Sequence, residues 1–335
     1  MVSRLATSLA RWAPRTLEIV GWVAVALMIG LCITQWFGID GRRSIAALQA
    51  MTPWLLVWAA PIALAASLTR RRPLALAALV PVLTLLVLSY PIVFHGGAPR
   101  AAAGAPTLTV AYSNMYFRNP NPDLAVQALL ARDADVMVMV ELATPLLNAL
   151  RAAVPPDDYP YRAGNERNDA GAISLWSRFP ITDGGVVRME GRHSIDVTLD
   201  VDGSAVHLLA VHANPPTVDA RLWRKQLGAI GDLAVASPRP TIVIGDFNAS
   251  RWHPSFRSLL DRGLRDAHET LGHGWSASWP MDDGVMPPPF VRIDHALFDD
   301  GITPLALREL QVPGSDHEGF VVTFGLTDDG VRRAG

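Results

Sequence analysis

The chain has 335 residues, of which 50% are hydrophobic, and its mean hydropathy is above zero, so it is too apolar for an ordinary soluble protein. Its single cysteine, Cys32, excludes an internal disulfide and a cysteine-based zinc cluster. The net charge of −2 hides two unlike parts: residues 1–100 hold nine arginines and two acids, whereas residues 101–335 hold 20 basic and 29 acidic residues. We therefore expect a basic, apolar N-terminal part joined to an acidic domain.

Three apolar segments precede residue 95 and predict three transmembrane helices, at residues 17–39, 46–68 and 74–94. Each reaches the roughly 20 residues that cross a bilayer core. Buried helices of a large soluble core are one alternative, which three consecutive segments of this length disfavour. A cleaved signal peptide followed by one anchor is the other, and the first segment is too long for the apolar part of such a signal.

The arginines predict how these helices are oriented. Residues 1–16 and residues 70–72 hold three arginines each, whereas the loop between the first two segments holds Arg42 and Arg43, offset by Asp40. Positively charged loops stay in the cytoplasm, so the N-terminus and the second loop are expected there. An odd number of spans then places the remainder of the chain on the extracytoplasmic side of the cell (inner or plasma) membrane.

From residue 107 the pattern becomes that of an α/β domain. Short apolar strands alternate with amphipathic helices, and an Asp-Gly turn at Asp202–Gly203 joins two alternating strands. Residues 95–106 are small and unpatterned, which is typical of a linker. We therefore expect a linker at 95–106, a globular domain at 107–326 and a C-terminal tail at 327–335.

Polar residues collect where the apolar runs of this domain stop. These positions are Asn114, Glu141, His212, Asp246 with Asn248, Asp294 at the end of a strand, and Asp316 with His317 just before the last strand. In a layered α/β fold several strand ends meet at one rim, so these residues can share one cleft.

The residue types suit metal-assisted phosphate chemistry. Carboxylate oxygens such as those of Glu141 are the ligands that Mg²⁺ prefers. Asn114 and Asn248 can hydrogen-bond a water or a phosphate oxygen without adding charge. His212 and His317 can hold a phosphate or move protons near neutral pH. Without a cation or phosphate nearby, the gathered carboxylates would raise each other's pKa values.

Each of these residues also has an ordinary structural interpretation. The interpretations are a turn for residues 245–248, a helix cap for Glu141, an N-cap for Asp316–His317, a surface acid for Asp294, a turn cap for Asn114 and a satisfied core histidine for His212. The complete ordered set is much less expected by chance than any one member.

In this order the motifs resemble the endonuclease/exonuclease/phosphatase superfamily, which includes DNase I-like nucleases, apurinic endonucleases, neutral sphingomyelinases and inositol polyphosphate phosphatases. The resemblance spans about residues 107–326 and rests on Asn114, Glu141 and the motifs SRFPI, VHANPP, GDFN, RIDHALF and SDHEGF. It implies an α/β fold of four layers, in which two packed mixed β-sheets are flanked by helices.

The resemblance also implies a metal and a water-activating group. Glu141 would be the main Mg²⁺ ligand, with Mn²⁺ as a possible substitute. Asp246, held by Asn114 and Asn248, would orient or deprotonate the attacking water and contact the metal.

Further roles implied by the resemblance concern the phosphate. Asp294 would pair with His317 and fix its tautomer, while His317 grips the scissile phosphate. Asp316 would support that histidine or contact a second metal. His212 would bind phosphate or protonate the leaving oxygen.

Several other polar and aromatic residues are assigned with less support. Arg178 in SRFPI is expected to have a structural role, and His295 is expected to point to the opposite face of its strand from Asp294. Trp252, Trp275 and Trp279, with residues 287–290, either line a substrate rim or serve ordinary packing.

Together these features predict a membrane-anchored, Mg²⁺-dependent phosphodiesterase or phosphatase that acts on a lipid head group or a small phosphoester. An extracytoplasmic nuclease acting on DNA or RNA is the alternative, which the acidic domain disfavours because backbone binding needs basic surface. A catalytically silent, membrane-tethered binding module is a further alternative, against which the intact site residues argue. The expected partners are the membrane and a phosphoester substrate.

Overall fold

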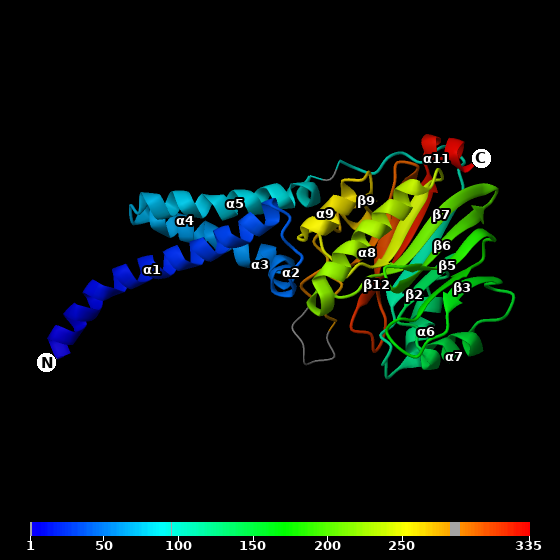
Figure 1. Cartoon of the computed structure of the whole chain (residues 1–335), viewed down its shortest axis with the longest axis horizontal. Coiled ribbons are helices and arrows are strands. Elements are labelled where there is room, and N and C mark those ends of the chain that lie inside the picture. The colour runs from blue at the N-terminus through cyan, green and yellow to red at the C-terminus, as the bar shows by residue number, and fades with distance from the viewer. Residues whose placement is uncertain (1, 95, 282–288) are drawn as a thin grey trace.

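A bundle of N-terminal helices extends from one side of an α/β domain in the computed structural model, which describes residues 2–94, 96–281 and 289–335, with side chains from residue 15 onward (Figure 1). The N-terminus and the turn between α4 and α5 lie at the end of the bundle far from the domain (Figure 1). The helices are α1 (Val2–Trp36), α2 (Arg43–Ala50), α3 (Thr52–Leu56), α4 (Ala59–Leu68) and α5 (Arg72–Val93).

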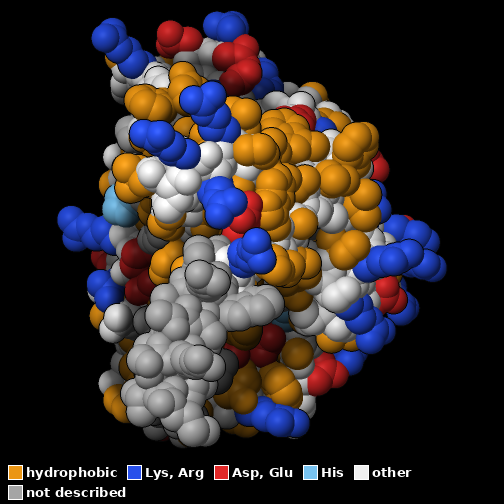
Figure 2. Space-filling view, turned by 90° about the vertical axis from the view of Figure 1, so that its left-hand side faces the viewer, with side chains coloured by type: hydrophobic (Ala, Val, Ile, Leu, Met, Phe, Trp, Pro, Cys, Tyr) orange, Lys and Arg blue, Asp and Glu red, His pale blue; other side chains and the backbone are white. Residues whose placement is uncertain are grey.

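Within the described residues, two helical segments are long and apolar enough to cross a membrane. They are Arg15–Trp36 in α1 and Arg72–Val93, and each has 22 residues. Leu27 in the first and Leu76 in the second are among many large apolar side chains that stay exposed. Figure 2 views the molecule from the end of the helical bundle far from the domain, where hydrophobic side chains cover much of the surface and basic side chains stand around them. An exposed apolar surface of this kind is typical of membrane contact.

The prediction of a continuous span at residues 46–68 is wrong. The chain bends by 68° between Arg43–Ala50 and Thr52–Leu68, so this part is a broken span or a re-entrant loop. The described residues thus contain two candidate membrane spans, or up to three if the bent pair forms one span. Pro53 stands at the start of α3, where its missing N–H cannot continue the previous helix. Residues before the bend pack on the domain instead: Ala46 is fully buried, and its carbonyl lies 3.0 Å from Nε2 of His253.

Two six-stranded sheets form the centre of the domain. The first has the order β11 (Ile302–Gln311), β12 (Glu318–Leu326), β1 (Thr107–Asn114), β2 (Val136–Val140), β4 (Ile173–Ser177) and β3 (Tyr161–Asn165). The second has the order β5 (Ile181–Met189), β6 (Arg192–Val201), β7 (Ser204–His212), β8 (Thr241–Asp246), β10 (Asp294–Phe298) and β9 (Arg265–Asp266). Both sheets are mixed, because β1–β2 and β7–β8 pair in parallel whereas the other pairs are antiparallel.

The sheets pack face to face and carry helices on their outer faces. Val110 and Tyr112 of β1 point into the apolar core between the sheets, whereas Ala111 points outward, as the two-residue period of a strand requires. Helices α6 (Pro122–Leu130) and α7 (Thr144–Ala153) cover the first sheet, and α8 (Pro216–Ala236) and α9 (Pro254–Leu260) cover the second. Short helices α10 (Ala267–Thr270) and α11 (Asp328–Ala334) complete the domain, the latter within the predicted tail. The predicted four-layer sandwich is confirmed.

Strand direction explains how the polar residues reach one rim. β1, β7 and β8 end at Asn114, His212 and Asp246. The prediction that Asp294 ends its strand is wrong, because β10 begins there. Since β10 runs antiparallel to β8, its first residue pairs with the last residue of β8, Asp246. The acid therefore still reaches the same rim.

Candidate active site

The rim between the two sheets brings most of the predicted polar residues together. Glu141 follows β2 directly, and His317 stands directly before β12. Four other members lie at strand termini and are buried: Asn114, His212, Asp246 and Asp294. The cluster thus draws on both sheets and on segments more than 200 residues apart in sequence.

The GDFN segment positions Asp246 through its backbone. Gly245 has a φ of +155°, and a Cβ at this position would stand 2.0 Å from the carbonyl oxygen of Val211. Only glycine fits such a close approach between paired strands. After the strand, Oδ1 of Asp246 accepts the N–H of Asn248 at 2.7 Å, and Asn248 itself takes a left-handed φ of +46°. The turn interpretation of this motif therefore holds, and the turn fixes the carboxylate.

Two asparagine amides hold the second oxygen of Asp246. Oδ2 accepts Nδ2 of Asn114 at 3.3 Å and Nδ2 of Asn248 at 3.2 Å. Asn114 also caps a turn, because its Oδ1 accepts the N–H of Tyr116 at 3.0 Å. Asn114 therefore satisfies its structural interpretation and supports Asp246 as well.

Two carboxylates of the cluster are held at raised pKa values. Burial raises the pKa of Asp246 to about 8, and the Asp294 carboxylate adds to the rise. Burial also raises the pKa of Glu141, whose Oε2 accepts the N–H of Phe117 at 3.0 Å. Nε2 of His212 faces both groups, at 3.8 Å from Glu141 Oε1 and 3.6 Å from Asp246 Oδ2. Buried carboxylates that share a site in this way suit a divalent cation with oxygen ligands.

Asp294 and His317 form a buried ion pair. Oδ2 of Asp294 lies 2.8 Å from Nδ1 of His317, and it also accepts the hydroxyl of Ser278 at 2.7 Å, while Oδ1 accepts the hydroxyl of Tyr112 at 2.7 Å. Burial alone would raise the pKa of Asp294, but the His317 charge and these hydrogen bonds lower it. Burial alone would lower the pKa of His317, but Asp294 raises it to about 10. At neutral pH His317 is therefore a cation, and its Nδ1–H is directed at Asp294.

His212 is not a satisfied core histidine. Its Nδ1 is buried without a hydrogen-bond partner in the described part of the chain. Its Nε2 lies 3.3 Å from a guanidinium nitrogen of Arg192. Burial and the Arg192 charge hold the pKa of His212 well below its ordinary value. A neutral imidazole in this position can bind a phosphate group, but it has no extra proton to give to a leaving oxygen.

The carboxylates that could hold a metal differ in whether a cationic side chain already pairs with them closely. Asp246, Asp294 and His317 each offer a ligand atom within 4.8 Å of the others. Asp294 and His317 already satisfy each other, so Glu141 and Asp246 are better placed to take a cation. Asp316 lies half-buried beside this group, close enough for its charge to act on Glu141.

Three residues of the site had not been singled out from the sequence: Tyr112, Ser278 and Arg192. Tyr112 stands two residues before Asn114 in the same strand, so its position on the same face could have been inferred from the strand period. Arg192 begins β6, and the antiparallel pairing of β6 with β7 across the Asp202–Gly203 turn brings it to His212, which ends β7. Ser278 reaches the site through tertiary packing alone.

The less supported residues fall mostly outside the cluster. Arg178 pairs with Asp133 at 2.7 Å and has the expected structural role. His295 bonds Asp266 on the far side of β10, opposite Asp294, as expected. Trp252 and Trp275 stack with ring centroids 5.9 Å apart on the wall of a cavity beside the helices. Of the predicted rim segment, residues 287 and 288 lie outside the described residues.

Comparisons with known proteins agree with this geometry. A model of the Endonuclease/Exonuclease/phosphatase family matches residues 111–317. UPF0294 proteins of Yersinia pseudotuberculosis and Yersinia pestis are each 23% identical over 252 residues, covering 69% of this chain and 92% of theirs.

Solved structures share the fold. D. rerio TDP2, complexed with single strand DNA product, aligns with a TM-score of 0.58 at 16% identity, covering 65% of this chain and 99% of that chain. An endonuclease/exonuclease/phosphatase family protein from Bacteroides thetaiotaomicron aligns with a TM-score of 0.54 at 16% identity, covering 68% and 97%. These likenesses confirm the DNase I-like architecture.

Proposed function

Because this chain belongs to the endonuclease/exonuclease/phosphatase family, whose fold serves hydrolysis of phosphoester bonds, we propose that it is a membrane-anchored, Mg²⁺-dependent phosphoesterase. The observation that carries the proposal is the single buried cluster in which Glu141 and Asp246 lie beside the Asp294–His317 ion pair. A catalytically silent binding module would have no need for such a set of buried charges, because each charge costs free energy to bury.

The donor set fits a hard divalent cation. Glu141 and Asp246 would hold Mg²⁺, or Mn²⁺ in its place, and Asp316 would serve a second ion if one binds. When bound, the metal would neutralise negative charge that develops on the phosphoryl oxygens. Burial raises the pKa values of Asp246 and Glu141 although the His317 charge opposes the rise, and a bound cation would oppose it further.

The protein side chains would divide the remaining work. Asp246, fixed by two asparagines, orients a water and accepts its proton as the water oxygen attacks phosphorus. The P–O ester bond on the opposite side breaks, and the leaving oxygen takes up a proton from solvent water. His317, kept protonated by Asp294, binds a phosphoryl oxygen. His212 is neutral and lies against Arg192, so we assign both to phosphate binding.

The arrangement of the helices supports an extracytoplasmic catalytic domain. Arg70 and Arg71 lie in the turn between α4 and α5, at the end of the bundle far from the domain (Figure 1). The loop after α1 lies at the other end, where Asp40 Oδ2 accepts the N–H of Ser255 at 2.8 Å. The arginine-rich end would stay in the cytoplasm, which places the domain outside.

A nuclease is the second candidate function. The DNA product bound to D. rerio TDP2 favours it, since the two folds are alike. The excess of acids in residues 101–335 opposes it, because phosphate neutralisation supplies much of the affinity for a nucleic-acid backbone. We rank a lipid phosphodiester or a small phosphoester first for this reason and because the helices would keep the cleft at a membrane surface.

Hydrolysis of bis-p-nitrophenyl phosphate by the full-length protein in detergent tests the proposal. We expect turnover with Mg²⁺ or Mn²⁺ and none with EDTA. Asp246→Asn should lower the rate roughly 10²–10⁴-fold, the usual contribution of a general base. Asp328→Asn, at an exposed position in α11, is the matched control and should retain the rate. Absence of turnover in the unmodified protein with either metal would favour the silent module, and faster cleavage of DNA than of phospholipids would favour the nuclease.

A further inference from the structure

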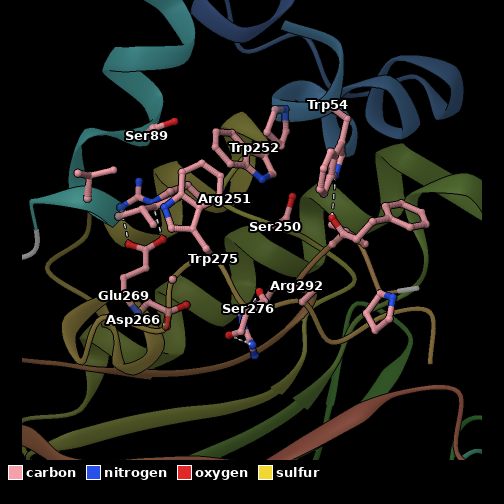
Figure 3. A pocket seen from close by; sticks show the side chains of 18 of the residues that line it. Trp54, Ser89, Ser250, Arg251, Trp252, Asp266, Glu269, Trp275, Ser276 and Arg292 are labelled. Atoms are coloured by element: carbon pink, nitrogen blue, oxygen red, sulfur yellow. Dashed lines mark hydrogen bonds and ion pairs between the residues drawn. The ribbon is translucent and has the colours of Figure 1, made fainter. Parts of the chain in front are cut away.

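A cavity of about 810 Å³ lies between the helical bundle and the catalytic domain (Figure 3). Helices α3 and α5 form one wall, and residues 250–252, 274–277 and 289–292 contribute to the other. Its size is within the range of small-molecule sites in proteins. The cavity therefore joins an apolar helix that can span a membrane to the domain that carries the proposed chemistry.

The cavity wall is built to hold an apolar group. The helices contribute Leu85, Leu86 and Ile92, and Trp252 and Trp275 face them from the domain. Figure 3 shows these tryptophans and Trp54 around the cavity. Aromatic side chains of this kind concentrate where a membrane meets water.

The two arginines on the wall already have partners. Arg251 forms a two-pronged pair with Glu269, and Arg292 lies 2.9 Å from Glu309. A second anionic ligand would have to compete with both carboxylates. The cavity thus favours a hydrocarbon chain over a further phosphate.

A buried hydroxyl on the wall lacks a partner among the described residues. Ser89 of α5 is 7% exposed, and its hydroxyl has no hydrogen-bond partner within the described residues. The side chain stands on the cavity wall in Figure 3. Buried hydroxyls are nearly always satisfied, so this one points to a ligand that supplies an oxygen beside its apolar part.

The chain segments that carry the candidate active site also line this cavity. Ser250 stands two residues after Asn248, Ser276 stands two residues before Ser278, and Arg292 stands two residues before Asp294. Glu318, next to His317, also lines the cavity. His295, on the opposite face of β10 from Asp294, lines it too. The same segments therefore form the site and part of the cavity wall.

The other end of the cavity reaches the level of lipid tails. Leu85 precedes Val93, the last residue of α5, by eight positions, which is about 12 Å along a helix. The wall thus runs from the domain along the apolar surface of α5.

We propose that the cavity holds an acyl chain of the substrate, so that the natural substrate is a lipid phosphoester cleaved at the membrane surface. This inference rests on the proposed function and keeps its chemistry: water oxygen binds phosphorus, one P–O ester bond breaks, and the leaving oxygen takes a proton. The acyl chain would lie along Leu85 and Leu86, and an ester or hydroxyl oxygen of the lipid would accept a hydrogen bond from the Ser89 hydroxyl.

Filling the cavity tests the inference in the full-length protein. Leu86→Trp places a large ring at a cavity position, whereas Leu76→Trp makes the same change at an exposed position of α5 outside the cavity. The measured quantity is kcat/KM for a long-chain phosphatidylcholine in mixed micelles, divided by kcat/KM for bis-p-nitrophenyl phosphate. We expect Leu86→Trp and Ser89→Ala to lower this ratio, the former about tenfold, as for loss of an apolar subsite. Leu76→Trp should leave it unchanged.

Photochemical labelling measures binding of the acyl chain separately from hydrolysis. In an Asp246→Asn background, a phosphatidylcholine with a photoreactive diazirine in its acyl chain should label residues 250–252, and added Leu86→Trp should abolish that label. Hydrolysis of the soluble ester with no label on the domain, or with an unchanged ratio in Leu86→Trp, would overturn the cavity assignment and leave the proposed function standing. A label on the domain without hydrolysis of either ester would overturn the proposed function and leave chain binding in place.

Discussion

At the scale of single residues, Asp294 determines the charge on His317. The carboxylate is fully buried and ionised because Tyr112, Ser278 and His317 all hydrogen-bond it. An imidazole in the same buried place would otherwise be neutral, since burial disfavours its cationic form. One carboxylate thus converts a buried histidine into a cation that can hold phosphate.

Replacing this carboxylate should change the pH dependence of the activity. The protonated form of His317 exists below its pKa, which Asp294 raises to about 10. In the Asp294→Asn variant, burial acts on His317 without the opposing charge, so the pKa of His317 falls. As the pH rises, this variant should therefore lose activity at a lower pH than the unmodified protein. The pH–rate profile of bis-p-nitrophenyl phosphate hydrolysis measures this shift. Tyr112→Phe keeps the carboxylate and should retain the alkaline limb near that of the unmodified protein; equal shifts in both variants would contradict the assignment.

The same residues show how far sequence alone can locate a site. Asn114, Asp246 and His212 could be predicted because each ends an apolar run, and strand ends of one sheet meet at a rim. Arg192 begins β6, and the antiparallel pairing of β6 with β7 brings it to His212, so the predicted turn at Asp202–Gly203 could have indicated it. Ser278 lies outside the strands, and only the tertiary fold brings its hydroxyl to Asp294. Sequence patterns report local periods, so a partner of this second kind leaves no local mark.

At the scale of elements, the sequence predictions were wrong about the end of the strand at which Asp294 lies and about a bend in the second apolar segment. Hydropathy at residues 46–68 is high enough for a span, but it cannot show that the first turns pack on α8 rather than in lipid. Likewise, an apolar run that contains Asp294 does not reveal at which end the strand begins. The two-sheet architecture itself could be predicted, because the order of strands and motifs is that of the family.

The close pairing of β7 and β8 gives a prediction at this scale. Gly245→Ala would drive a Cβ into the Val211 carbonyl, 2.0 Å away, in a backbone conformation that favours glycine. We expect a loss of about 3 kcal/mol or more in the free energy of unfolding, beyond the usual effect of a single substitution. Chemical denaturation of the full-length protein in detergent measures it. Gly228→Ala in α8, where a Cβ meets nothing within 4 Å, is the control and should stabilise by about 0.5–1 kcal/mol.

At the scale of the whole molecule, polar contacts fix the domain against the helical bundle. Asp40 is fully buried, accepts the N–H of Ser255 and forms an ion pair with Arg224, whose Nε lies 3.0 Å from its Oδ1. Gln35 accepts a guanidinium N–H of Arg257 at 3.0 Å. A domain on a free tether would need none of these contacts. These contacts fix the orientation of the domain on the helices, which the proposed cleavage of a lipid at a membrane surface requires.

The orientation of the chain in the membrane can be tested by cysteine labelling, because the chain has a single cysteine of its own. Cys32 is 2% exposed, so an introduced cysteine at an exposed position is the one that reacts with a membrane-impermeant maleimide. Asp328→Cys lies in the catalytic domain, and Thr69→Cys lies beside the arginine-rich turn at the far end of the bundle. In intact spheroplasts we expect labelling of Asp328→Cys, and labelling of Thr69→Cys only after permeabilisation, because the arginines hold that turn in the cytoplasm. The reverse pattern would place the catalytic rim in the cytoplasm and would require substrates of the inner leaflet.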